Sequence, residues 1–344
     1  MRIWPRFAVE RQLIRDTFRQ ARATGIFWMM LTVTGICVAL CLSASVSGDT
    51  DIHGSDDDLG MFLPGSASRP AGKQQRGPEN DPVEAQREGI ATISGRMTLA
   101  FGAVSIPLGR DRNDAVHFVE LLLAWGMAGT FGMLLTLVWT AGFMPGFLEP
   151  STAAVLLTKP IARWRLLLGK YLSVLFFVGF QAVLFIILTW LALGMRTGIW
   201  DMAYWWCIPF LLLEFAVFYS FSVFLSVLTR STVACVFGSL LFWLLAWGIN
   251  FGSAMARGEP ESHSLPSSTV HLAHAAYWMC PKPIDASLIL YHALGAEHYF
   301  EKPAVFRLLE SARGFSPALS ILSSLVIAAA LLALSAYEFG AKDY

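Results

Sequence analysis

Residues 171–195 read YLSVLFFVGFQAVLFIILTWLALGM, a run of 25 residues without a charged side chain. A helix needs about 20 mostly apolar residues to cross the hydrocarbon core of a bilayer, so this stretch is long enough to span a membrane. Five further windows are also about 20 residues or longer and mostly apolar. They cover residues 25–47, 118–143, 202–228, 231–251 and 317–337. The sequence therefore predicts an all-α membrane protein with six transmembrane helices.

The composition supports this class and excludes others. Hydrophobic residues make up 55% of the chain and charged residues 15%, whereas soluble domains contain about 25% charged residues. The net charge of zero argues against a nucleic-acid partner. A phosphate-binding loop requires the pattern GxxxxGK[ST], and the run Gly169-Lys170-Tyr171 does not match it. We expect no catalytic residues, no cofactor and no ATP hydrolysis by this chain alone.

The basic residues predict the orientation. Short segments rich in Lys and Arg stay in the cytoplasm, and residues 1–24 and 144–170 fit that rule. Six spans place both termini on the same side, so the tail 338–344, which contains Lys342, is expected there as well. Residues 1–24 are expected to form an amphipathic elbow helix, which lies on the membrane surface with its arginines on lipid headgroups. Its arginines are Arg2, Arg6, Arg11, Arg15, Arg19 and Arg22. The sequence thus predicts a multi-pass protein of the bacterial cytoplasmic (inner) membrane with both termini in the cytoplasm.

Two long loops are then predicted to face the outside. The loop 48–117 is rich in Asp, Pro, Gly and Ser, so we expect disorder up to about Glu88 and a short strand pair between Ile90 and Leu108. The loop 252–316 is expected to contain helices at Thr269–Met279 and Asp285–Ala296, with Asp285 as the N-cap of the second.

Two histidines of the second loop offer an alternative function. His271 and His274 are three residues apart, and Met279 and Cys280 follow them; imidazole and sulfur ligands suit copper or zinc. The alternative is therefore an intramembrane or metal-handling protein. No HExxH or CxxC pattern accompanies these histidines, and we expect no metal there.

Residues 144–171, MPGFLEPSTAAVLLTKPIARWRLLLGKY, predict a short helix between two spans. Pro150 suits its first turn, and Lys159-Pro160 ends it. The apolar residues between these two points are too few to cross a bilayer. The segment is therefore expected to be a stiff cytoplasmic foot that another protein can contact.

This segment resembles the coupling-helix region of type-2 exporter permeases of the ATP-binding-cassette (ABC) family. The similar residues are Glu149, Leu156-Leu157-Thr158-Lys159-Pro160-Ile161-Ala162-Arg163 and Leu168-Gly169-Lys170-Tyr171. The C-terminal residues 339–344 are also similar to the ending of these permeases. The resemblance implies a homodimer or heterodimer of permeases, each docking a cytoplasmic ATP-binding subunit on residues 148–166. Its implied coupling residues are Glu149, Leu156, Leu157, Lys159, Pro160 and Arg163.

Intramembrane polar and small residues point to a transport path. Glu214 lies near the middle of the fourth window, where a carboxyl group is costly and a functional role is the default. Its candidate partners are Gln181, Tyr219 and Ser220, whereas Glu120 is expected to be interfacial. The resemblance implies that the second and fifth helices flank the path. Small residues at four-residue spacing allow helices to approach closely, either between subunits or within one; they are Ala124, Ala128, Gly132, Ala234 and Gly238.

The interpretation that best accounts for these features is the permease subunit of an ABC-type exporter, with membrane lipids around it and ATP hydrolysed by a separate subunit. The metal-handling protein is the alternative, and a scaffold that only organises partners would also use the foot. The sequence does not predict the transported substrate.

Overall fold

The computed structural model describes residues 6–43, 45–48, 95–99, 104–108, 112–149, 162–258, 267–298, 302–311 and 316–341. The chain divides into two units, of which one comprises residues 1–42 and 117–344 and the other residues 43–116. The loop up to Glu88, which the sequence predicts to be disordered, and most of the predicted foot lie outside the described residues.

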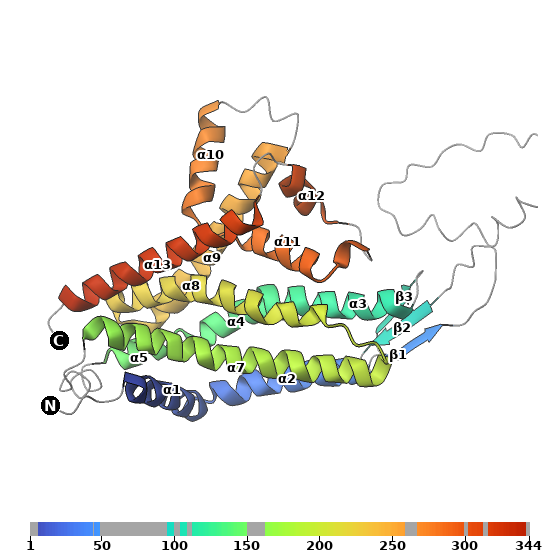
Figure 1. Ribbon diagram of the computed structural model, residues 1–344, viewed down its shortest axis with the longest axis horizontal. Coiled ribbons are helices and arrows are strands. Elements are labelled where there is room, and N and C mark those ends of the chain that lie inside the picture. The colour runs from blue at the N-terminus through green and yellow to red at the C-terminus, as the bar shows by residue number, and fades with distance from the viewer. Residues whose placement is uncertain are drawn as a thin grey trace, which may run out of the picture. The chain divides into compact units, whose positions relative to one another are not determined.

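Within the described residues, six helical segments are long and apolar enough to cross a membrane, which confirms the predicted all-α class (Figure 1). The first is α2 (Ile26–Ser43), and the second joins α3 (Arg112–Leu122), η2 (Leu123–Thr130), α4 (Phe131–Thr140) and α5 (Phe143–Phe147). The third is α7 (Arg163–Thr197), and the fourth joins η3 (Ala203–Trp206) to α8 (Cys207–Thr229). The last two are α9 (Thr232–Gly258) and α13 (Pro317–Ala341).

The first span is shorter than its apolar window. Helix α2 ends at Ser43, and strand β1 (Ser45–Gly48) follows it. This strand pairs with β2 (Gly95–Leu99), which pairs with β3 (Val104–Leu108) in an antiparallel sheet ordered β1-β2-β3. The predicted strand pair is therefore present. Strand β1 was not predicted, because Ser45 and Val46 continue the apolar run and hydropathy alone does not separate strand from helix in a short segment.

Helix α7 begins eight residues before the apolar window, at Arg163 rather than at Tyr171. Arg, Trp, Leu and Lys all occur readily in helices, so the helix continues beyond the stretch that hydropathy marks. It ends where Gly198 adopts a left-handed conformation (φ 74°) and donates its N–H to the Gly194 carbonyl, a common way to terminate a helix. The long helix therefore includes the Gly169-Lys170-Tyr171 motif.

Helix α8 lies at the centre of the helical unit. Its residues Phe215, Phe218 and Val223 are buried in a core shared with α4 and α7. By contrast, α9 and α13 expose large apolar side chains such as Phe237 (69%) and Tyr337 (73%). Apolar outer surfaces of this kind are expected where helices contact lipid.

The segment between the last two spans is helical, as predicted. It contains α10 (Ser267–Met279), α11 (Pro283–Ala293), η5 (Ala296–His298) and α12 (Ala304–Ser311), and α10, α11 and α12 all contact α9 (Figure 1). The expected N-cap is wrong: α11 begins at Pro283, with Lys282 in the capping position. Proline presets the first helical turn, which leaves the Asp285 side chain available for contacts elsewhere.

Candidate functional site

Helix α1 (Arg6–Ala23), the predicted elbow helix, packs against the start of α7. Gly169 permits the close approach, since a Cβ there would lie 2.8 Å from Leu13 Cδ1. Phe18 on α1 makes an edge contact with the Phe177 ring, with 5.2 Å between the centroids. The glycine of the Gly169-Lys170-Tyr171 motif thus serves helix packing.

Lys170 lies inside this contact and is only 4% exposed. Its Nζ donates hydrogen bonds to Thr17 Oγ1 (3.1 Å) and Gln20 Oε1 (2.9 Å), both on α1. The ammonium group also lies 5.7 Å from the centroid of the Phe143 ring, within cation–π range. In the sequence, Lys170 is one charge of a basic segment that is predicted to be cytoplasmic. The structure instead makes it a buried link between α1, α5 and α7.

Two further contacts connect the same end of the bundle. The hydroxyl of Tyr171 donates to the Ala216 carbonyl of α8 at 2.9 Å. In the first turn of α7, Arg163 Nη1 donates to the Gly340 carbonyl near the end of α13 at 3.4 Å. The elbow helix, the start of α7 and the end of α13 therefore lie at one end of the bundle.

The predicted coupling residues are only partly within the described chain. Glu149 is exposed just after α5, and Arg163 begins α7. Leu156, Leu157, Lys159 and Pro160 lie outside the described residues. The described residues thus define the two points between which the predicted foot is held.

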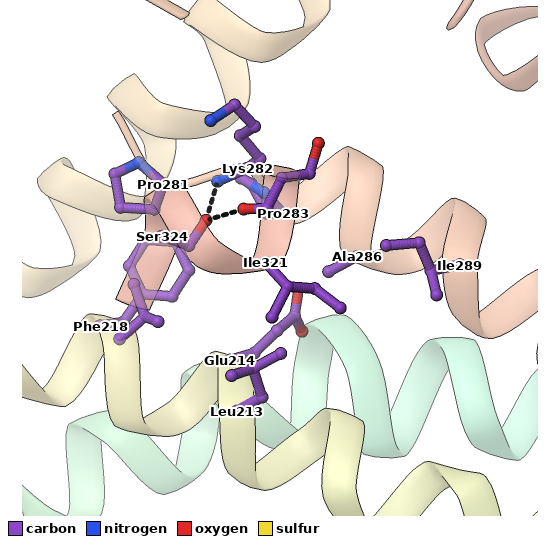
Figure 2. Close-up of a pocket in the computed structure, with 12 residues that line it drawn as sticks. Leu213, Glu214, Phe218, Pro281, Lys282, Pro283, Ala286, Ile289, Ile321 and Ser324 are labelled. Atoms are coloured by element: carbon purple, nitrogen blue, oxygen red, sulfur yellow. Dashed lines mark hydrogen bonds between the residues drawn. The ribbon is translucent and has the colours of Figure 1, made fainter. Parts of the chain in front are cut away.

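Glu214 lies on α8 and faces α11 and α13 (Figure 2). Pro283, Ala286 and Ile321 line a narrow cavity with it, and Gly129 of the π-helical segment η2 lines a second small cavity on which Glu214 also borders. Single-turn π bulges often occur at functional sites. The acid is therefore surrounded mainly by apolar groups, next to an irregular part of the second span.

The expected partners of Glu214 make other contacts or none. Ser220 donates to the Val217 carbonyl at 2.6 Å. Among the described residues, neither the Tyr219 hydroxyl nor the Gln181 amide has a hydrogen-bond partner. Helix α8 carries Tyr219 and Ser220 five and six positions beyond Glu214, at angles that direct them to other neighbours.

Gln181 belongs to a separate cavity. The walls of this cavity come from α2, α4, α7 and α8, and they include Thr34, Gly132 and Leu211. A buried amide without a partner is unusual and makes this cavity a second candidate for a polar ligand or water. Gly132, which the sequence analysis assigned to the path, lies at this cavity rather than beside Glu214.

The other small residues have different positions. Ala128 lies in the π-helical segment η2. A Cβ at Gly238 would overlap the Leu225 side chain of α8. Gly238 therefore permits close packing of α9 on α8 within one subunit. This favours packing within a subunit over packing between two subunits as the role of Gly238.

Sequence reasoning missed a buried polar network around Asp285, which is fully buried. Its carboxylate accepts hydrogen bonds from Tyr277 (2.5 Å), Ser320 (2.6 Å) and Asn250 (3.3 Å). These donors come from α10, α13 and α9, so the network joins the segment between the last two spans to both of those spans. An acid inside the largely apolar stretch PKPIDASLIL, residues 281–290, was the indication available in the sequence.

The two outer-loop histidines do not form a compact ligand set in the described structure. Both His271 and His274 are exposed, and His274 Nε2 accepts a hydrogen bond from Trp278 Nε1 at 3.2 Å. Burial raises the pKa of the Cys280 thiol, although Lys282 opposes that rise. A raised thiol pKa leaves less of the thiolate that binds metals.

A comparison with protein-family models matches residues 12–344 to the ABC-2 family transporter protein. The chain therefore belongs to the ABC-2 transporter family and is a multi-pass membrane permease of that family, as the resemblance of the foot implied. No curated protein sequence matches the chain.

Proposed function

We propose that the chain is the membrane-spanning subunit of an ATP-driven exporter of the bacterial cytoplasmic membrane. It works as a dimer, either with a second copy or with a related permease, and a separate cytoplasmic subunit hydrolyses the ATP. The family match over residues 12–344 supports the transporter class. The chain itself has no GxxxxGK[ST] sequence, so the proposal assigns nucleotide binding to the partner.

The ATP-binding subunit docks on residues 148–166 in this proposal. The observation that supports it most strongly is the way both ends of this segment are held. Leu148, its first residue, is fully buried, and Arg163, near its end, is hydrogen-bonded to the end of α13. Lys170 then connects α7 to α1. A force on the foot would therefore reach four helices together instead of moving a loose loop.

The same end of the bundle is the cytoplasmic one in this proposal. The basic N-terminal segment supports this orientation through the positive-inside rule. A cytoplasmic ATPase can dock on residues 148–166 only if this end of the bundle faces the cytoplasm. One experiment on the foot therefore tests both the docking site and the orientation.

The path for the substrate is proposed to run beside Glu214 and the second span. Glu214 borders two small cavities, and Ala128 and Gly132 lie in and just after the π-helical segment next to them. An intramembrane carboxyl group can bind a polar substrate group or a proton. Gly238 contributes to this path only indirectly, by holding α9 against α8.

The decisive experiment changes the two leucines of the foot. A short helix is marginal alone in water, so we expect Leu156 and Leu157 to anchor it in a groove of the ATPase, where each buried Leu contributes about 1.5–3 kcal/mol. The variant Leu156→Asp, Leu157→Asp should lose the P-loop ATPase that co-purifies with the wild type while it still inserts into the membrane.

Two controls make the result specific. The variant Ser151→Asp, Thr152→Asp adds the same charge to the same segment and should retain the ATPase. Glu214→Gln should retain the complex and alter only transport. Recovery of the ATPase at wild-type yield with the double Leu variant would show that the coupling assignment is wrong.

A further inference from the structure

Three potential metal ligands meet where the second span begins and the third span ends. His117 and Glu120 lie on α3, and Asp201 lies between α7 and α8. One ligand atom from each residue lies within 4.8 Å of the other two. His117 Nδ1 is 3.2 Å from Glu120 Oε2 and 3.6 Å from Asp201 Oδ2. The cluster therefore converges on one point from two separate parts of the chain.

Glu120 was expected to be an interfacial acid, and the structure adds that its side chain is buried within the protein. The residue is 3% exposed, and neither of its carboxylate oxygens has a hydrogen bond within the described chain. The His117 ring lies at ion-pair distance but outside hydrogen-bond geometry. A buried carboxylate without hydrogen bonds is strongly unfavourable, so the two oxygens can accept a further cation or donor beside His117.

A divalent cation suits this cluster. Two carboxylates and a neutral imidazole, the form in which His binds a metal, sum to a charge of −2, which one divalent ion neutralises. Asp201 is held in place independently, because its Oδ1 accepts the Ala203 N–H at 2.8 Å while Oδ2 faces His117.

The ligand types and spacing fit zinc. Calcium and magnesium take mainly oxygen ligands in larger numbers, whereas imidazole together with carboxylates suits zinc and neighbouring transition metals. Zinc lies about 2.0–2.2 Å from nitrogen and oxygen ligands in tetrahedral sites, which places ligand atoms about 3.4 Å apart. The two distances from His117 Nδ1 lie on either side of that value.

We propose that His117, Glu120 and Asp201 bind a divalent transition-metal ion, zinc in particular, which fastens the start of the second span to the α7–α8 connection. Three protein ligands leave a fourth position for water. The ion holds α3 in place one turn before the π-helical segment that lines the Glu214 cavity. The site uses none of the outer-loop histidines and does not depend on how the ATPase docks.

The test measures zinc on the purified full-length protein in detergent after treatment with a chelator. Titration with zinc chloride, followed by calorimetry and elemental analysis, should give one tightly bound zinc per chain. X-ray absorption should show only nitrogen and oxygen ligands at about 2.0 Å. Zinc should also raise the apparent melting temperature.

Two ligand variants and one control complete the experiment. Glu120→Gln keeps the size of the side chain and should weaken zinc binding at least 100-fold, and His117→Ala should do the same. His271→Ala with His274→Ala should keep wild-type affinity. The proposal fails if the wild type binds no stoichiometric zinc, if Glu120→Gln binds it equally well, or if only the outer-loop variant loses it. The wild-type stoichiometry and absorption spectrum decide the matter even if a variant fails to fold.

Discussion

Lys170 and Glu120 are both buried charged side chains, but they lie at opposite ends of the bundle and their surroundings differ. Lys170 is near the start of α7 and donates to two acceptors on α1. Glu120 lies near Asp201, just beyond the other end of α7, about 40 Å away at 1.5 Å per residue. Its carboxylate has no hydrogen bond among the described residues.

The difference distinguishes a structural contact from a candidate binding site. At the elbow end, the buried ammonium donates two hydrogen bonds to α1 of the same chain. At the opposite end, Asp285 accepts hydrogen bonds from three helices, whereas Glu120, next to His117 and Asp201, accepts none among the described residues. Burial alone therefore does not identify a functional group. At Glu120 the two observations that point to a ligand are a buried carboxylate without hydrogen bonds and two further ligand-type side chains beside it.

The largest effect is expected from removing Asp285. Asp285→Ala leaves three buried donors without their acceptor, and at about 1 kcal/mol for each hydrogen bond the loss is about 3 kcal/mol. Thermal unfolding in detergent, followed by tryptophan fluorescence, should show a clear decrease in the apparent melting temperature. Asp285→Asn retains one acceptor oxygen and should lose about half as much. Equal stability of Asp285→Ala and wild type would contradict a structural role.

A smaller effect is expected from Lys170→Met, which preserves the length of the side chain but removes its charge and both hydrogen bonds. Thr17 still bonds the Leu13 carbonyl, so mainly Gln20 loses its partner, and we expect about 1–2 kcal/mol. The same melting assay measures it. Arg15→Met changes an exposed charge on the same elbow helix and should have little effect. An equal loss in both variants would show that the burial of Lys170 is not what matters.

The smallest effect concerns an exposed ion-pair cluster in the outer segment, where Lys302 Nζ lies 2.9 Å from Glu310 Oε1. Burial alone would raise the pKa of Glu310, but hydrogen bonds with Lys302 and His292 outweigh it and lower this pKa below 4.5. A carboxyl group whose pKa is lower in the folded state stabilises the fold above its unfolded pKa. That contribution is lost as the pH falls through the folded value.

Melting curves of the wild type and Glu310→Gln between pH 3 and pH 7 test this sign. The two proteins should differ slightly near pH 7 and converge toward pH 3. The effect should be small, because exposed ion pairs contribute about 0–1 kcal/mol. If the difference in melting temperature between the two proteins grew as the pH falls, the pKa of Glu310 would be raised by folding and not lowered.

The elements that hydropathy alone specifies were predictable. Each apolar window corresponds to a helix that is long and apolar enough to span a membrane, because the bilayer demands a run of apolar residues that is visible without any tertiary contact. Glu214 was identified as an acid within a span for the same reason. The foot stays a prediction from its residues, and the family match agrees with the family that those residues resemble.

Other features depended on which helices meet. Nothing in the spacing of Lys170, Thr17 and Gln20 shows that they are bonded, because they are about 150 residues apart in the chain. The hydrogen-bond partners expected for Glu214 were wrong. Which side chains on α7 and α8 can reach Glu214 depends on the angle at which each leaves its helix and on how the helices pack.

The amino-acid sequence by itself determined the class of protein, the spans and the resemblance of the foot, since these follow from local composition and short motifs. Only the tertiary structure brought His117 and Glu120 to Asp201, and only it showed that Glu120 is buried without a hydrogen bond. A site of this kind is made of residues distant in sequence, and its energetics depend on burial and on the neighbours that packing provides.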